Sequence, residues 1–157
     1  MPENTFHEAT IFCHYIVNSL DRLLACLDGL SAEQLNWQPA VPNANSLYAL
    51  TTHTLGNTEE NILFTLFGKP SSREREKEFL AQGYSADELI ARWHILRTQM
   101  QEALLGLSSK DLQEERTHPR RGVITGLDIL IVVARHTAEH LGQAELTRDL
   151  MLAATSK

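Results

Sequence analysis

Two histidines are the most chemically suggestive residues of this 157-residue chain. His136 and His140 are four positions apart, so on a helix they lie about 40° apart around the axis and about 6 Å apart along it. Both rings can therefore reach one point. Both also lie on the apolar stripe of their segment, where an imidazole loses its hydration and needs a polar partner. A network of polar side chains or a metal ion would satisfy them.

A third histidine, His53, lies on the apolar stripe of a different expected helix, close to Leu50. Gly56 removes side-chain volume just beyond it, where a pocket would need room. Three histidine ligands leave one position open on a tetrahedral ion, which is typical of catalytic rather than structural sites. The sequence is therefore compatible with a metal site of His53, His136 and His140. The competing interpretation is a set of core histidines satisfied by ordinary hydrogen bonds.

Three polar residues at helical spacing from these histidines are candidates for the surrounding pocket. Asn57 and Glu60 follow His53 by four and seven positions, and Gln143 follows His140 by three. Such side chains orient a ligand ring through its second nitrogen or contact a substrate. For Glu60 the competing interpretation is a solvated carboxylate at the rim of the helices.

The segment 136–140 also matches the H-x-x-E-H pattern of inverted zinc peptidases, with Glu139 as the general base. The domain is small for a peptide-binding cleft, so we prefer the three-histidine site. The remaining histidines fall off the apolar stripes or in a loop, and we expect them to be at least partly exposed: His7, His14, His94 and His118.

Four segments with helical periodicity are expected to position these residues, at 5–27, 46–67, 85–107 and 125–152. Gly29 and Gly68 are stop signals for the first two, and Ser85-Ala-Asp-Glu88 has the form of a capping box for the third. Two short pieces, 30–35 and 107–112, each predict a single helical turn after a serine cap. No alternating pattern predicts a strand, so the expected fold class is all-α.

The composition is that of one folded domain spanning residues 1–157. Hydrophobic residues make up 43% and charged residues 22%, with a formal net charge of −6. An acidic chain is a poor candidate for nucleic-acid binding, and its only dense basic cluster is small: Arg116, His118, Arg120 and Arg121. The link 71–82 is a charge run, which predicts a solvated loop or a short exposed helix.

We expect the protein to be cytoplasmic and to have no membrane partner. The longest apolar run, 129–134, is far shorter than the ~20 residues of a membrane span. Cys13 and Cys26 would lie ~20 Å apart along one helix, too far for a disulfide. Unpaired thiols and the absence of a signal-peptide pattern suggest a reducing compartment.

With these motifs, the chain resembles the DinB/YfiT-like superfamily of small metalloenzymes over nearly its whole length. The resemblance rests on the inward His53, on Trp37, on Gly83-Tyr-Ser-Ala-Asp-Glu-Leu89 and above all on His136-Thr-Ala-Glu-His140-Leu-Gly-Gln143. It implies a four-helix bundle of up-down-down-up order with long crossover connections. It also implies a divalent metal held by one histidine of the second helix and two of the last, positions that His53, His136 and His140 match one for one.

The better-understood members of this family are transferases or isomerases that use low-molecular-weight thiols. The resemblance therefore implies such an enzyme, or a metal-dependent hydrolase, acting on a small-molecule substrate. A divalent ion on three neutral histidines can lower the pKa of a bound thiol or water and create a nucleophile. Zn, Ni and Fe all suit imidazole ligands, so the metal stays open. The alternatives are a non-catalytic metal-binding stress-response protein and a metal-free helical interaction module.

The resemblance further implies a homodimer. Several apolar residues lie outside the main stripes of the first two helices, where they either cover one another within the chain or form a twofold dimer patch. These residues are Ile11, Tyr15, Ile16, Ile62 and Leu66.

Overall fold

The computed structural model describes residues 8–156, which are mostly helical with one short pair of strands, and this confirms the predicted all-α class. Four long helices make up most of it: α1 (Glu8–Ala25), α3 (Leu47–Glu59), α5 (Asp87–Leu105) and α7 (Gly126–Thr155). The shorter elements are α2 (Ala32–Leu35), α4 (Arg75–Glu78), α6 (Ser109–Gln113), β1 (Glu115–His118) and β2 (Gly122–Thr125). Phe6 and His7, which the sequence assigned to the first helix, lie outside the described residues.

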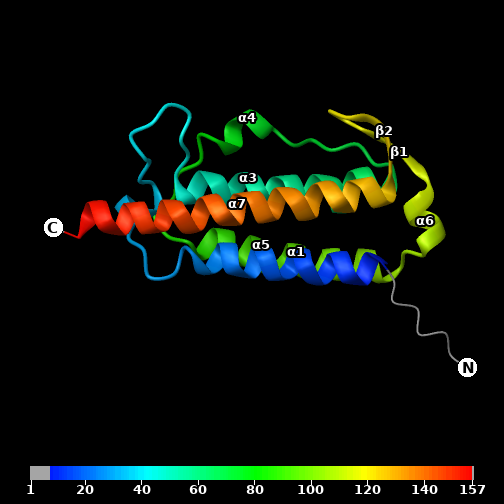
Figure 1. Cartoon of the computed structure of the whole chain (residues 1–157), viewed down its shortest axis with the longest axis horizontal. Helices are drawn as coiled ribbons and strands as arrows, with labels where there is room; N and C mark the ends of the chain where they lie inside the picture. Colours follow the sequence, from blue (N-terminus) through cyan, green and yellow to red (C-terminus); the bar gives the residue numbers. More distant parts are fainter. Residues whose placement is uncertain (1–7, 157) are drawn as a thin grey trace, which may run out of the picture.

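The four long helices lie alongside one another (Figure 1). Helix α1 packs against α7 and α5, and α3 packs against the same two helices. Along the colour gradient of Figure 1, α1 and α7 run in one direction, and α3 and α5 run in the other. Apolar side chains such as Leu20, Leu55 and Ile129 are fully buried between the helices. This arrangement brings α3 beside α7, so the helix of His53 lies next to the helix of His136 and His140.

Most helix ends follow the cap signals of the sequence. Reciprocal capping boxes form at three starts, Ser31 with Gln34, Ser108 with Asp111, and Thr125 with Asp128. The capping box predicted at Ser85 is wrong, because the helix begins at Asp87 and the Ser85 Oγ atom accepts the Asp87 backbone N–H at 3.3 Å. Gly68 ends the second helical segment with a φ of 65°, the left-handed conformation that favours glycine.

The expected helix 46–67 changes its winding before it ends. After α3 the backbone forms a π-helical turn, Glu60–Phe64, and then a 3₁₀ turn, Thr65–Phe67. Single π-helical turns inside α-helices are frequent at functional sites. Here the turn begins one helical turn after Asn57 and carries two buried polar residues, Glu60 and Asn61.

The prediction of no strands is wrong for one short hairpin. Strands β1 and β2 pair antiparallel, with Thr117 opposite Val123. Four-residue strands leave almost no alternating pattern for sequence reasoning to detect. The turn between them ends at Gly122, whose φ of 74° a residue with a side chain adopts only with strain. The hairpin lies beside the 3₁₀ turn and the start of α7 (Figure 1).

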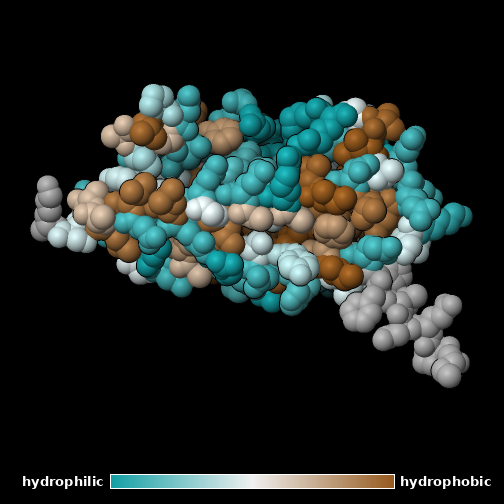
Figure 2. Space-filling model, in the orientation of Figure 1, coloured by the Kyte–Doolittle hydropathy of each residue, from teal (hydrophilic) through white to brown (hydrophobic). Residues whose placement is uncertain are grey.

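The apolar residues considered for a dimer surface divide into two groups. Ile16, Ile62 and Leu66 are buried within the chain, whereas Ile11 and Tyr15 are 41% and 63% exposed. Figure 2 also shows hydrophobic residues near both ends of α7, where exposed side chains include Ile131, Leu146 and Leu150. Homodimer formation stays a prediction, which light scattering checks. Among the described residues, no helix is long and apolar enough to span a membrane.

Candidate metal centre

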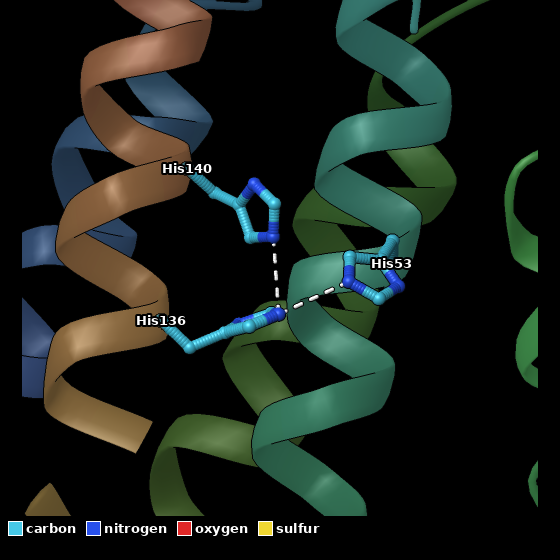
Figure 3. Close-up of side chains that lie close together, drawn as sticks. All are labelled: His53, His136 and His140. Carbon is cyan, nitrogen blue, oxygen red and sulfur yellow. Dashed lines mark hydrogen bonds between the residues drawn. The ribbon is translucent and has the colours of Figure 1, made fainter. Parts of the chain in front are cut away.

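His53 of α3 faces His136 and His140 of α7 (Figure 3). The Nε2 atom of His136 lies 3.0 Å from the Nε2 atom of His53 and 3.0 Å from that of His140. Nitrogen ligands at 2.0–2.1 Å from a tetrahedral ion lie about 3.3 Å apart, a spacing close to the observed one. The structure thus brings together the three histidines that the sequence singled out, and this group could hold a metal ion.

In His53 and His140, a hydrogen-bond acceptor next to Nδ1 decides which ring nitrogen carries the hydrogen. The His53 Nδ1 atom is 3.3 Å from Glu78 Oε1, and the His140 Nδ1 atom is 2.7 Å from Gln143 Oε1. Carboxylate and amide oxygens only accept, so each Nδ1 donates its hydrogen and the neutral ring keeps a lone pair on Nε2. Arg73 is also 3.3 Å from His53 Nδ1, but its Nη2 group donates to Glu78 at 2.7 Å. Metal-binding histidines typically have such an acceptor behind them.

His136 differs from the other two because its buried Nδ1 atom has no hydrogen-bond partner among the described residues. Burial, with the neighbouring His140 and His53, lowers the pKa of His136 to about 2. Burial also lowers the pKa of His140 below its ordinary value. His136 and His140 are therefore neutral at neutral pH. The donor set fits a metal cation.

Arg73 and Glu78 form a second layer behind His53. Their side chains are only 6% and 10% exposed, and Arg73 donates to both oxygens of Glu78. Burial alone would raise the pKa of Glu78, but hydrogen bonds from His53 and Arg73 hold it below its ordinary value. The prediction that the link 71–82 is solvated is therefore wrong at these two positions. Phe79, the next residue, stacks on the His53 ring with centroids 4.4 Å apart.

Gly56 provides the room for this second layer. A Cβ atom at this position would lie 1.8 Å from Glu78 Oε2. The prediction that Gly56 makes room next to His53 is confirmed. Part of the space admits the Glu78 carboxylate that orients His53, and Gly56 also lines a cavity of about 280 Å³.

The three residues expected to line the pocket, Asn57, Glu60 and Gln143, lie in different surroundings. Gln143 bonds to His140, as described above. Asn57 is buried and lines a cavity of about 330 Å³ together with His53 and His136. Glu60 is 5% exposed, so its interpretation as a solvated carboxylate at the rim is wrong. It does not contact a histidine of the group and instead accepts from Arg73 at 2.9 Å and from Arg120.

His118 was expected to be partly exposed and is buried, with 4% of its surface accessible. Its Nδ1 atom accepts the Arg120 backbone N–H at 3.0 Å, so its Nε2–H donates to Asn61 Oδ1, also at 3.0 Å. These bonds fasten the hairpin turn to the π-helical turn. Arg120 and Arg121 of that turn line the cavity beside His53. The only sequence signal for them was the small basic cluster.

The expectations for His14 and His94 and for the peptidase motif have different outcomes. His14 and His94 are exposed, as predicted. Glu139, the general base of the peptidase interpretation, is 57% exposed at its side chain and lies 3.8 Å from Arg135. Its carboxylate is therefore not part of the histidine group, and the structure gives the peptidase interpretation no support.

The sequence profile of the DinB superfamily matches residues 15–144. No curated protein is significantly similar to the chain. A conserved protein from Enterococcus faecalis is similar in structure, with a TM-score of 0.78 and 15% identity over 95% of this chain and 99% of that one. A DinB-like protein from Bacillus cereus has a TM-score of 0.68 and 20% identity over 92% and 91%. These identities show a shared fold, and the profile match over most of the chain shows that it belongs to the DinB superfamily.

Proposed function

We propose that this protein is a metal-dependent enzyme that activates a low-molecular-weight thiol for transfer to a small-molecule substrate. A divalent ion, Zn, Ni or Fe, would be held by His53, His136 and His140. The observation that carries the proposal is the convergence of their three Nε2 atoms, two of which keep lone pairs because of Glu78 and Gln143. When bound, the ion supplies Lewis acidity, which lowers the pKa of a coordinated thiol or water.

The composition of the histidine group supports an open ligand position. Among the described residues, no fourth His, Cys, Asp or Glu joins the three histidines. The two cysteines lie on or just after α1, and Cys13 is half-buried while Cys26 is buried. An incoming thiol therefore does not have to displace a protein ligand. A closed structural site would instead have four protein ligands.

The surrounding residues support catalysis more than simple metal storage. Phe79 covers one face of the His53 ring, and Glu78 and Gln143 fix the orientation of two rings. A cavity of about 330 Å³ lies directly beside His53 and His136, large enough for a small molecule. An enzyme needs a space for its substrate beside the metal, whereas metal storage requires only the histidines. This favours the enzyme over the storage alternative.

The test is a titration of the cobalt-substituted protein with 2-mercaptoethanol. We expect a sulfur-to-cobalt charge-transfer band to appear, because the thiolate takes the open position. The His94→Ala variant, altered at an exposed histidine of α5, is the matched control and should give the same band. A protein that binds one cobalt ion per chain but shows no spectral change with thiol would contradict the proposal. Turnover of thiol with electrophilic substrates then separates catalysis from binding.

A further inference from the structure

The cavity next to the histidines has an electrostatic character opposite to that of the whole chain. The chain carries a net charge of −6. Yet three arginines, Arg75, Arg120 and Arg121, line this cavity, and none of the described acidic residues does. An arginine-lined cavity beside a metal centre attracts anions and disfavours cations.

The three arginines are not equally available to a ligand. Arg120 is paired with Glu60, which Arg73 also contacts. Arg75 pairs with Glu76 at 2.8 Å and lies over the Phe79 ring, 5.0 Å from its centroid.

Arg121 is different, because its side chain makes no ion pair with any residue that the structure describes. Arg121 is exposed and lines the cavity, so it offers there a positive charge that no described carboxylate pairs with. A planar guanidinium binds carboxylate and phosphate oxygens through two parallel hydrogen bonds.

The turn that carries Arg121 is held in place before any ligand binds. His118 is buried at one end of the turn and bonds to Asn61 and to the backbone of Arg120. The Arg121 backbone N–H also donates to the His118 carbonyl at 3.4 Å. A fixed turn loses little conformational entropy when a ligand binds, which favours its use in recognition.

Asn57 provides a second polar group inside the same cavity. It is only 9% exposed, and its Oδ1 atom is buried without a partner among the described residues. Buried polar atoms are nearly always hydrogen-bonded, so an orphaned one on a residue that lines a cavity leaves its amide available to a ligand or a water molecule. Since Asn57 follows His53 by one helical turn, a molecule that contacts Asn57 lies close to the histidines.

We infer that this cavity binds the oxyanion of a small molecule, a carboxylate or a phosphate, through Arg121, while a polar group of the same molecule bonds to Asn57. The inference rests on the proposed function for placing the reacting atom at the histidines. Binding of the oxyanion itself depends on Arg121 and not on the metal, so the two can be tested separately.

The first experiment measures oxyanion binding by the full-length chain, both metal-loaded and after chelation. Inorganic phosphate and succinate are titrated by calorimetry at constant ionic strength, with chloride as the reference anion. The Arg121→Gln variant removes the free guanidinium. The Arg22→Gln variant is the matched control, because it removes an exposed arginine that pairs with Glu145 and does not line the cavity. We expect affinity to fall about tenfold or more in Arg121→Gln and to be unchanged in Arg22→Gln.

The two probes distinguish the kinds of oxyanion. Binding of phosphate but not succinate that depends on Arg121 identifies a phosphate site, and the reverse identifies a carboxylate site. Either result supports the inference. Equal affinities in the wild type and in both variants, or no binding of either anion, would overturn it.

The second experiment separates this inference from the proposed function. On cobalt-loaded protein, 3-mercaptopropionate should bind about tenfold more tightly than 2-mercaptoethanol, and Arg121→Gln should abolish that difference. If neither thiol changes the spectrum while oxyanion binding still depends on Arg121, the oxyanion site stands and the proposed function fails. If both thiols bind equally well in wild type and variant, and no oxyanion binding depends on Arg121, the proposed function stands and the oxyanion site is wrong.

Discussion

The half of the molecule formed by α1 and α5 differs from the half formed by α3 and α7 in what it buries. All buried residues of α1 and α5 are apolar, among them Leu20, Trp93 and Met100. Helix α3 and the turns that follow it instead bury a series of polar residues: Thr51, His53, Thr54, Asn57, Thr58, Glu60, Asn61 and Thr65. Burying a polar group costs free energy unless a partner satisfies it. The polar interior therefore needs an explanation that the apolar half does not.

Part of that explanation is local. The hydroxyl groups of Thr54 and Thr58 donate to the carbonyls of Leu50 and Thr54, four residues earlier in the same helix. His53 and Glu60, by contrast, take their partners from distant segments, and the Asn57 Oδ1 atom has none among the described residues. The α1–α5 half thus supplies burial of apolar surface, and the α3–α7 half positions chemistry. Four substitutions test this division.

The largest effect is expected for His136→Ala. His136 is within 3.0 Å of both other histidines, so its removal leaves two ligands that face each other across a gap. Bound metal should fall from about one ion per chain to near zero. Elemental analysis of the purified variant measures this, and far-UV circular dichroism should show that the helices persist. A variant that keeps one ion per chain would show that the centre lies elsewhere.

The next largest effect is expected in the other half of the molecule. Leu96 of α5 is buried in the apolar core at 2% exposure. Leu96→Ala should lower the free energy of unfolding by about 2–5 kcal/mol, because it leaves a cavity among packed side chains. Urea unfolding measures the loss, and metal content of the folded variant should stay unchanged. Loss of metal from folded Leu96→Ala protein would contradict the conclusion that only the α3–α7 half positions the metal ligands.

Glu60→Gln should reveal the buried charges of the α3–α7 half. Burial alone would raise the pKa of Glu60, but hydrogen bonds from Arg120 and Arg73 lower it below its ordinary value. At pH 7 the variant should be less stable by about 1.5–3 kcal/mol, since hydrogen bonds to a charged group are lost.

The pH dependence of this difference has a definite sign. A lowered pKa means that the unfolded chain takes up a proton before the folded chain does. The contribution of Glu60 is therefore complete well above the unfolded pKa and declines as the pH falls below about 4.5. Urea unfolding of wild type and variant from pH 7 to pH 4 should show the stability difference shrinking toward acid. A difference that grows toward acid would contradict the ion-pair assignment.

Gly56→Ala should have the smallest of the four effects. It is also the substitution most specific to Arg73 and Glu78, the second layer behind His53. The added methyl group collides with Glu78 Oε2 and should displace the acceptor behind His53. Metal affinity should fall about 10–100-fold, as is common when such an acceptor is lost. Competition with a chromophoric chelator measures the affinity.

Gly142→Ala is the matched control for this substitution. It also adds a methyl group to a helix, but apart from the adjoining backbone of that helix no described atom lies within 4 Å of the new Cβ position. Helix propensity predicts that it stabilises the fold by up to about 1 kcal/mol and leaves metal affinity unchanged. Equal metal affinities in Gly56→Ala and Gly142→Ala would show that Glu78 does not tune the centre.

Several features of the protein follow from local sequence alone. The juxtaposition of His136 and His140 is fixed by the 3.6-residue repeat, because residues four apart always share a helix face. The same local geometry places Gln143 beside His140, and it makes serine and threonine caps begin α2, α6 and α7. Periodicity of apolar residues also sufficed for the all-α class, since four long amphipathic segments need one another to cover their apolar faces.

Other features appear only when distant segments pack together. His53 meets His136 across 83 positions of sequence, Glu78 reaches His53 across 25, and His118 reaches Asn61 across 57. Arg73, Glu78 and His118 resemble solvated residues in sequence because nothing local distinguishes a buried charge from an exposed one. The sequence by itself therefore determined the helices and the histidine pair on α7, whose geometry is set by the backbone. Only the tertiary structure decided which charges are buried behind His53 and which arginine is left unpaired at the cavity, because these depend on partners supplied by other elements.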